Sequence, residues 1–271
     1  MSDSDRGQVN RSAAEVYDAF FVPALFQQWA SRIADAADFQ TGHDVLDVAC
    51  GTGVLTRTVA ERVGPTGEVI GLDNNEDMLT VAQRKAPHIR WQHGKAEALP
   101  FDDASFDVVV SQFGLMFFED RAVAIQEMTR VLKPDGRLVV AVWDSLTNTP
   151  GYAAMVELLQ RLFGHDIANG LRAPYVLGDT QQLRSLFNVP ELVQVDILTQ
   201  QGHARFPSIE SWVHTDIKGW TLADQIDDTQ YTQLLHEAKT TLSHFVGTDG
   251  EVIFSAPAHI VVACKRSLVE E

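Results

Sequence analysis

The sequence predicts an α/β protein with a doubly wound, mostly parallel sheet. Short apolar segments rich in β-branched residues alternate with amphipathic segments of helical periodicity between residues 45 and 143. A glycine-rich turn directly follows the first apolar segment, and an acidic residue ends the second. Alternating strands and helices normally build parallel sheets, whose ligands bind beyond the carboxyl ends of the strands. We therefore expect a ligand site at that edge.

The elements of this region follow from periodicity and turn signals. Residues 12–37 carry apolar side chains at near-helical spacing, and we expect two short helices because Pro23 interrupts them. Gly64 ends one helix, and Asn74 or Asn75 can cap the next. We expect strands at 45–49, 68–72, 89–93, 106–111 and 137–143, and helices at 54–63, 76–85 and 119–132.

The later part of the chain has a looser pattern. We expect helical segments at 152–163 and 208–246, and a strand at 192–198 between them. Strand-like segments at 251–254 and 258–264 follow, and we expect the last of them to close the sheet.

Composition excludes several classes of protein. The chain has 271 residues and a net charge of −16, and its Lys and Arg residues form no run, so we expect no nucleic-acid partner. No apolar run approaches the roughly 18 residues of a membrane span, and the polar start does not resemble a secretory signal peptide. Cys50 and Cys264 are too few for a disulfide framework and lack metal-ligand spacing. We expect a cytoplasmic protein without a metal site, and the oligomeric state stays open.

The central motif is VLDVACGTG at residues 45–53. A strand leads into a turn that contains Gly51, Thr52 and Gly53, and a helix follows. Glycine lets the backbone approach a ligand closely and adopt a positive φ. Asp73 ends the second strand, where a carboxylate can accept both hydroxyls of a ribose. Strand, loop, helix, strand and acid in this order predict a nucleoside-containing cofactor.

Two side chains near the loop help to choose the cofactor. The dinucleotide fingerprint needs a third glycine, where this chain has Thr56. Asp47 precedes the loop and would repel a pyrophosphate, but it can serve a cationic amino group, directly or through water. The alternative is that Asp47 only hydrogen-bonds amides of the loop. A zwitterionic amino acid joined to a nucleoside fits these residues better than a dinucleotide.

The stretch 45–142 resembles class I S-adenosylmethionine-dependent methyltransferases, above all the branch that includes C-methyltransferases of ubiquinone and menaquinone biosynthesis. The resemblance rests on VLDVACGTGVLT, VIGLDNNEDML, GKAEALPFDDASFDVVVSQFGL and MTRVLKPDGRLVVAVW. The segment AEVYDAFFVPALFQQWA is similar, more loosely, to the lid helices of that branch. The resemblance implies a Rossmann-like, mostly parallel seven-stranded sheet with N-terminal lid helices and a helical insertion late in the chain. It also implies S-adenosylmethionine as cofactor and S-adenosylhomocysteine as product.

The same resemblance implies which residues hold the methionine and ribose parts of the cofactor. Gly51 and Gly53 would contact the methionine part, with Thr52 in the turn between them. Asp73 would bind the ribose, with Asn74 beside it. Each of these positions follows the family motif residue by residue.

On the adenine side, Met78 would pack on the base, although a plain helix-core role is the alternative. Lys95 and Ala96 match the pair that flanks the adenine edge, with Glu97 next, and Gln112 matches a position near the sulfonium. Many relatives carry Asp or Asn where this chain has Lys95, and an ammonium group has donors only. Either Glu97 or a backbone carbonyl replaces that acceptor, or Lys95 points to solvent.

A catalytic base has no clear motif in this sequence. The histidines form neither a triad nor a metal cluster by spacing. His214, in an aromatic-flanked segment near Trp212, is the candidate, and Tyr17 and Tyr152 are equal candidates for residues near the site. A general base is needed only when the nucleophile must lose a proton, so methyl transfer does not require one.

We expect a methyltransferase that moves a methyl group to a small, hydrophobic acceptor by in-line displacement. The alternatives are a nicotinamide-dependent oxidoreductase and a non-catalytic S-adenosylmethionine-binding protein. The expected organisation is lid helices at 1–40, a cofactor-binding core at 41–146, a substrate-covering region with one core strand at 147–250, and a final core strand with a tail at 251–271.

Overall fold

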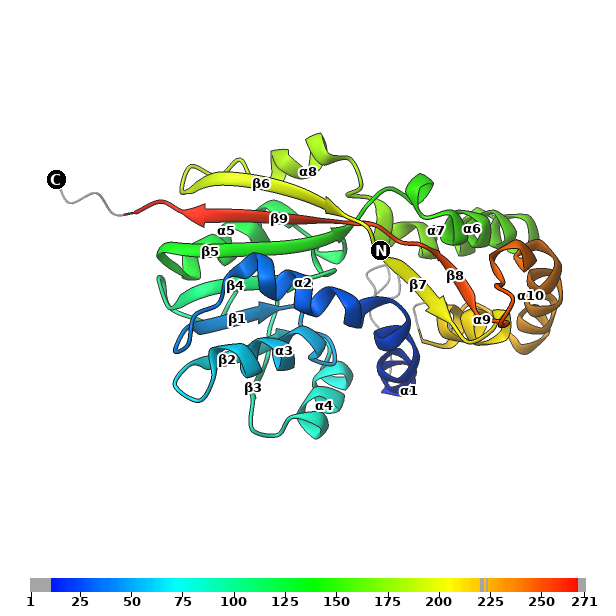
Figure 1. Ribbon diagram of the computed structural model, residues 1–271, viewed down its shortest axis with the longest axis horizontal. Helices are drawn as coiled ribbons and strands as arrows, with labels where there is room; N and C mark the ends of the chain where they lie inside the picture. The colour runs from blue at the N-terminus through cyan, green and yellow to red at the C-terminus, as the bar shows by residue number, and fades with distance from the viewer. Residues whose placement is uncertain (1–10, 220–221, 223, 268–271) are drawn as a thin grey trace.

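A seven-stranded sheet forms the centre of the computed structural model, which describes residues 11–219, 222 and 224–267 (Figure 1). The strands lie in the order β3-β2-β1-β4-β5-β9-β6. Neighbouring strands are parallel except where β9 pairs with β5 and β6. The predicted fold class is therefore confirmed. The strands are β1 (Asp44–Val48), β2 (Glu68–Asp73), β3 (Arg90–His93), β4 (Phe106–Gln112), β5 (Leu132–Trp143), β6 (Leu192–Gln200) and β9 (Ala258–Lys265).

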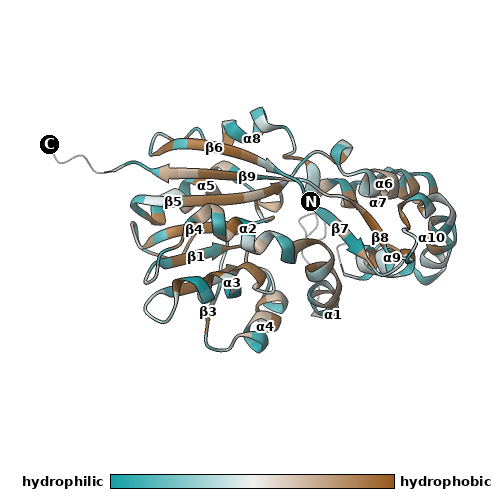
Figure 2. Cartoon of the chain, in the orientation of Figure 1, coloured by the Kyte–Doolittle hydropathy of each residue, from teal (hydrophilic) through white to brown (hydrophobic). Residues whose placement is uncertain are grey.

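Helices cover both faces of this sheet, so its central strands are apolar on both sides. α2 and α3 pack together in front of the sheet in Figure 1, and α5 and α8 pack together behind it. Figure 2 shows β4 and β5 largely in brown, as expected for strands that are buried on both faces. The helices are α2 (Gln27–Ala37), α3 (Val54–Val63), α4 (Glu76–Lys85), α5 (Arg121–Val131) and α8 (Thr180–Leu186).

The N-terminal helical segment runs on without a break, so the prediction of two short helices separated at Pro23 is wrong. α1 (Arg11–Val16), a π-helical stretch η2 (Tyr17–Phe26) and α2 follow one another directly. Pro23 lies inside η2, and the N–H of Gln27 donates to the carbonyl of Val22, five residues back. The wider π turn takes the preceding carbonyl out of the path of the proline ring, which an α-turn would not.

The helix predicted at 119–132 is shorter at both ends. Asp120 caps it by accepting hydrogen bonds from N–H groups of the first turn. Its last residue is Val131, because Leu132 is extended and already pairs with Phe106 of β4. The fifth strand therefore begins earlier than the predicted 137–143.

The later part of the chain forms a lobe beyond the carboxyl ends of the central strands (Figure 1). The helical stretch predicted at 208–246 divides into α9 and α10, and a capping box at Asp227 begins α10. Trp212 of α9 lies at the centre of the lobe, 4.7 Å from the ring of Phe254. The elements of the lobe are η4 (Leu146–Asn148), α6 (Pro150–Phe163), α7 (His165–Arg172), η5 (Ala173–Tyr175), β7 (His203–Phe206), α9 (Ile209–Lys218), α10 (Asp228–Thr241), η6 (Ser243–Phe245) and β8 (Val252–Ser255).

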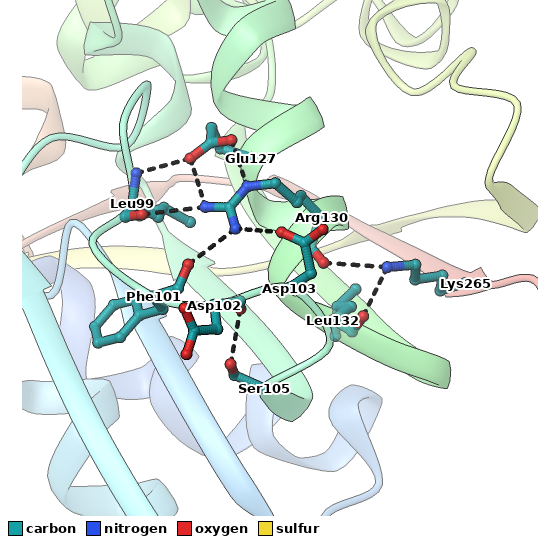
Figure 3. Close-up of polar contacts among 9 residues, drawn as sticks. All are labelled: Leu99, Phe101, Asp102, Asp103, Ser105, Glu127, Arg130, Leu132 and Lys265. Carbon is teal, nitrogen blue, oxygen red and sulfur yellow. Dashed lines mark hydrogen bonds and ion pairs between the residues drawn. The ribbon is translucent and has the colours of Figure 1, made fainter.

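Arg130 of α5 fixes the loop between β3 and β4, as Figure 3 shows. Its guanidinium group donates to the carbonyls of Leu99 and Phe101 and pairs with Glu127 and Asp103. Glu127 in turn accepts the N–H of Leu99. These contacts tie the loop to a helix that is itself packed on the sheet. They hold in place a segment whose first residues line the cavity described next.

Candidate functional site

A cavity lies beyond the carboxyl ends of β1, β2 and β4, the edge where doubly wound sheets bind ligands. Eight of the eleven residues predicted to contact the cofactor line it: Gly51, Asp73, Asn74, Met78, Lys95, Ala96, Glu97 and Gln112. The remaining lining residues are Tyr17, Ala49, Leu72, Asn75, Gly94, Phe113, Gly114, Phe117, Phe118 and Glu119. Residues that are far apart in sequence thus form one continuous wall.

Asp73 ends β2 and organises the glycine loop opposite. Its Oδ2 accepts the N–H of Gly51 at 2.8 Å, and its Oδ1 accepts the N–H of Asn75 at 2.9 Å. Burial raises the pKa of Asp73 above its ordinary value, whereas these backbone N–H groups lower it. The N–H of Asn74 also contributes to lowering the pKa of this carboxylate, whose oxygens together have about four acceptor directions. A vicinal pair of ribose hydroxyls is the kind of donor set that this arrangement accepts.

Gly51 and Gly53 meet two different demands. Both have positive φ angles, +55° and +82°. A Cβ atom at Gly51 would meet no heavy atom within 4 Å, so this part of the wall faces open space. A Cβ atom at Gly53 would lie 2.3 Å from the ring of Trp91. Gly51 leaves room for a ligand, and Gly53 lets the turn pack on the protein below it.

Asp47 is fully buried beneath the loop and does not line the cavity. Its Oδ2 accepts a hydrogen bond of 2.6 Å from the hydroxyl of Thr56, and its Oδ1 has no partner among the described residues. Burial raises the pKa of Asp47 to about 7; Thr56 lowers it and repulsion from Asp73 raises it further. The contact is thus with a side chain of α3 and not with the amides of the loop. A nearby cation would favour the ionised form.

The contacts of Lys95 and Glu97, in the segment after β3, bear on which group could accept from an adenine amino group. The Lys95 ammonium lies 3.3 Å from Oε1 of Glu119 and is largely exposed. Glu97 is engaged elsewhere, because its Oε1 accepts the N–H groups of Glu119 and Asp120 at 2.8 and 3.3 Å. Oε2 of Glu97 takes no part in these two contacts, so Glu97 and the backbone carbonyls both stay candidates for accepting from an adenine amino group.

Met78 lies where either of its predicted roles is possible. It is buried against Ala13, Ala14 and Val81, and it also lines the cavity. Its helix begins at Asn75, whose Oδ1 accepts the N–H of Met78 at 3.1 Å, so Asn75 is the capping residue of the two considered. Helix core and cavity wall are therefore the same surface here.

A second cavity, which we call the aromatic chamber, adjoins the first and shares Tyr17, Phe113 and Phe117 with it. Phe113 follows β4 with a φ of +56° and stacks on Trp143 at the end of β5, with ring centroids 3.8 Å apart. The chamber is lined by Tyr17, Phe21, Leu25, Phe26, Phe113, Phe117, Trp143, Tyr152, Leu171, Pro174 and Tyr175. Most of its lining residues are aromatic, and three of them are tyrosines.

Four predicted site residues lie outside these walls. Thr52 and Gly53 belong to the buried underside of the loop, as does Asp47. His214 of α9 lines neither cavity, and its ring lies edge-on to Phe20 at 5.4 Å. Tyr152, in contrast, lines the chamber, as proposed for a residue near the site.

Sequence reasoning missed several residues of the chamber. Phe26 and Trp143 approach one another from η2 and β5, with ring centroids 5.8 Å apart, and Tyr175 comes from η5. Trp143 carried a usable signal, since it ends a strand at the edge where ligands bind. Tyr175 carried none, because it lies on a short helical turn within a region of loose pattern.

The donor set suits an organic cofactor. In the described part of the chain, no group of three or more His, Cys, Asp or Glu side chains is placed to hold a metal ion. No helix in that same part is long and apolar enough to span a membrane. The Asp73 carboxylate, the open wall at Gly51 and the unpartnered oxygen of Asp47 fit a nucleoside that carries a cationic amino acid.

Solved structures with the same fold include methyltransferases. The YcgJ protein from Bacillus subtilis matches with a TM-score of 0.59 and 21% identity, over 89% of this chain and 99% of its own. Phosphoethanolamine N-methyltransferase 2 of Haemonchus contortus, solved with S-adenosylmethionine, matches with a TM-score of 0.63 and 18% identity, over 97% of this chain and 59% of its own. At these identities the likeness shows the fold alone.

Sequence comparison is more specific. A demethylmenaquinone methyltransferase of Staphylococcus aureus (strain JH9) is 38% identical over 169 residues, which cover 58% of this chain and 70% of the relative. The corresponding enzyme of Staphylococcus carnosus (strain TM300) is 34% identical over 188 residues, 64% of this chain and 78% of its own. The model of the ubiE/COQ5 methyltransferase family matches residues 6–169. The match spans more than half of the chain, which therefore belongs to this family and is an S-adenosylmethionine-dependent methyltransferase.

Proposed function

We propose that the cavity at the glycine loop binds S-adenosylmethionine and that the aromatic chamber binds the methyl acceptor. The observation that carries this proposal is the junction of the two spaces at Tyr17, Phe113 and Phe117. A donor in one cavity and an acceptor in the other would be held side by side. Such positioning is the main contribution that a protein makes to an in-line displacement.

Within the first cavity, Asp73 accepts the ribose hydroxyls and Met78 packs on the adenine, with Ala96 at the edge of the base. Gly51 gives the methionine part room, and Asp47 favours its ammonium group through the loop. When bound, the cofactor supplies an activated methyl group on a sulfonium. Gln112, whose Oε1 has no partner among the described residues, lines this cavity next to Phe113 in the chain and orients that end.

The acceptor that suits the chamber is a hydroxylated aromatic molecule of the hydroquinone class. The aromatic walls match a flat, apolar ring, and the staphylococcal relatives are named as methyltransferases of demethylmenaquinone. A hydroquinone ring is electron-rich, so a ring carbon can attack the methyl group directly. Direct attack by a ring carbon needs no base before the methyl transfer, because that carbon loses its proton to solvent only after the new carbon–carbon bond has formed. The sequence accordingly needs no base motif for this reaction.

The proposed organisation of the chain follows from the walls of the chamber. Phe21, Leu25 and Phe26 belong to the predicted lid at 1–40, and Tyr152 and Tyr175 belong to the covering region at 147–250. Between them, the core at 41–146 contributes the cofactor cavity. The tail at 251–271 contains β9, which completes the sheet between β5 and β6.

The proposal is tested by filling the chamber. Leu171→Trp replaces an aliphatic side chain in the wall of the chamber with a larger indole ring, at a position that does not line the first cavity. We expect the purified protein to methylate 1,4-naphthohydroquinone under anaerobic conditions, and the variant to lose at least tenfold in kcat/KM while binding S-adenosylhomocysteine as before. Unchanged methylation by the variant would move the acceptor out of the chamber. Cofactor binding without turnover on any hydroquinone would show that the acceptor belongs to another chemical class.

A further inference from the structure

A buried histidine joins the sheet to the segment that follows η5. His259 lies near the start of β9 and lines neither cavity. Its Nε2 lies 3.0 Å from the carbonyl oxygen of Gly178 and 3.3 Å from Oδ1 of Asp144, and its Nδ1 lies 2.9 Å from the hydroxyl oxygen of Thr199. The strands β6 and β9, the end of β5 and the turn after η5 therefore meet at this ring.

The direction of the bond between His259 and Gly178 follows from the chemistry of its partners. A carbonyl oxygen only accepts, so Nε2 of His259 carries a hydrogen and donates it. The hydroxyl group of Thr199 can either donate to Nδ1 or accept from it, so this second contact holds whether the ring is neutral or protonated. The link to Gly178 is thus present in both forms of the ring.

The segments that His259 joins carry two walls of the aromatic chamber. Gly178 closes the turn after η5, where its N–H donates to the carbonyl of Tyr175, a residue of the chamber. Asp144 directly follows Trp143, the chamber residue at the end of β5. η5 also packs on β5. The imidazole therefore ties these two walls together from outside the chamber.

Both ends of this link are themselves fixed. Oδ1 of Asp144 accepts the N–H of Ser145 at 2.6 Å, and its Oδ2 accepts from the side-chain amide of Asn148 at 2.9 Å. A Cβ atom at Gly178 would lie 2.2 Å from the backbone nitrogen of Ser145. Glycine at this position therefore lets the turn lie directly against the end of β5.

The chamber between these walls is small. Its volume is about 40 Å³. An apolar cavity that admits benzene in another protein measures about 150 Å³. A ring therefore enters the chamber only when its walls yield, and a thick molecule requires a larger displacement than a flat one. How far the η5 wall yields depends on what holds it to the sheet.

We propose that His259 is a positioning residue of the acceptor site, which holds η5 against β5 through Gly178 and so makes the chamber select flat aromatic rings over saturated rings of the same outline. The inference rests on the proposed function of the chamber. Without the imidazole, the carbonyl of Gly178 loses its buried partner. The turn then moves to reach another donor or water, and the η5 wall yields more easily.

The test compares 1-naphthol with decahydro-1-naphthol, which has the same two fused rings and the same hydroxyl group but is saturated and thicker. Calorimetry on the full chain saturated with S-adenosylhomocysteine gives a dissociation constant for each probe. In the parent protein we expect 1-naphthol to bind about tenfold more tightly, the lower end of the discrimination that a tight apolar pocket achieves against one extra methylene group.

Two variants of His259 divide its contacts between them. The amide nitrogen of Asn is as many bonds from Cβ as Nδ1, so His259→Asn keeps a partner for Thr199 but none for Gly178. The ratio of the two dissociation constants should then fall to about twofold or less, because the Gly178 carbonyl has lost its hydrogen bond. The amide nitrogen of Gln is as many bonds from Cβ as Nε2, so His259→Gln keeps a donor for Gly178 and should retain most of the preference.

Two further variants separate this role from a general loss of stability. Gly178→Ala places a Cβ atom against Ser145 and should lower the ratio, because it pushes the same turn away from β5. Thr129→Val removes a buried hydroxyl group that donates to the carbonyl of Ile125 within α5, at a position that lines neither cavity. It should lower the stability of the protein and leave the ratio unchanged.

A ratio that stays at the parent value in both His259→Asn and Gly178→Ala would overturn the inference. Equal losses in His259→Asn and His259→Gln would overturn it as well, because the contact with Gly178 would then not be the one that matters. Equal binding of both probes by the parent would do the same while leaving the chamber as the acceptor site. Binding of neither probe would contradict the proposed function itself. Should His259→Asn fail to fold, Gly178→Ala and Thr129→Val decide between these outcomes.

Discussion

Asp73→Asn tests the carboxylate on which the proposed cofactor site depends. In the parent, its two oxygens accept the N–H groups of Gly51 and Asn75 at 2.8 and 2.9 Å. The amide keeps one acceptor and turns an NH₂ group toward the other backbone N–H. One buried N–H then loses its partner, which costs about 1–3 kcal/mol of the free energy of unfolding. Urea unfolding of both proteins measures this loss.

The same substitution weakens cofactor binding by a separate amount. A hydrogen bond from a ribose hydroxyl to an ionised carboxylate contributes about 1.5–3 kcal/mol, so we expect affinity for S-adenosylhomocysteine to fall roughly 10- to 150-fold. Isothermal titration calorimetry measures it, with Asp102→Asn as control because that carboxylate is exposed outside the cavity. If Asp73→Asn bound S-adenosylhomocysteine as tightly as the control, the ribose would not lie on this carboxylate.

Three further predictions concern the loop and its supports. Gly53→Ala should lower the free energy of unfolding by about 1–3 kcal/mol more than Gly250→Ala, because both have a positive φ but only the first places a Cβ against Trp91; equal losses in chemical denaturation would refute the clash. Arg130→Ala should lower the free energy of unfolding by about 1–3 kcal/mol and speed hydrogen exchange in the loop of Figure 3. Arg130→Lys should recover only part of the lost stability, and unchanged exchange in the loop would contradict the anchoring role. Burial raises the pKa of Asp47 to about 7 in the folded protein, against about 3.8 in the unfolded chain, so its contribution to stability falls as the pH rises between these values. Between pH 4 and 8, the free energy of unfolding of the parent should fall by up to about 4 kcal/mol relative to that of Asp47→Asn. Parallel pH curves for the two proteins would exclude the shift.

The geometry of the proposed cofactor cavity was predictable because its signals are local. The loop from Gly51 to Gly53 follows a strand directly, and Asp73 ends the next strand, so the topology alone brings them together. The helices at 54–63 and 76–85 match their predicted bounds because Gly64 and Asn75 mark one end of each. Where a turn residue and a periodic pattern agree, sequence is enough.

The acceptor side was not predictable for the opposite reason. The chamber joins Phe26 of η2, Trp143 of β5 and Tyr175 of η5, whose contacts depend on packing between segments far apart in the chain. Pro23 carried a misleading signal, because a proline normally ends a helix and the π turn that accommodates it leaves no mark in the sequence. Asp216 is a plain acidic residue in the sequence, and only its burial against Tyr152 distinguishes it.

The electrostatics of the loop connect these parts to the proposed chemistry. Asp47 and Asp73 are both buried, and the pKa of Asp47 is raised mainly by burial and further by the charge of Asp73, so ionising both acids together is unfavourable. Thr56 relieves only part of it with one hydroxyl. A cofactor with an ammonium and a sulfonium group brings positive charge to this region and favours the ionised carboxylates. The product, S-adenosylhomocysteine, has lost the sulfonium charge, so the same two acids should hold it less strongly than the substrate.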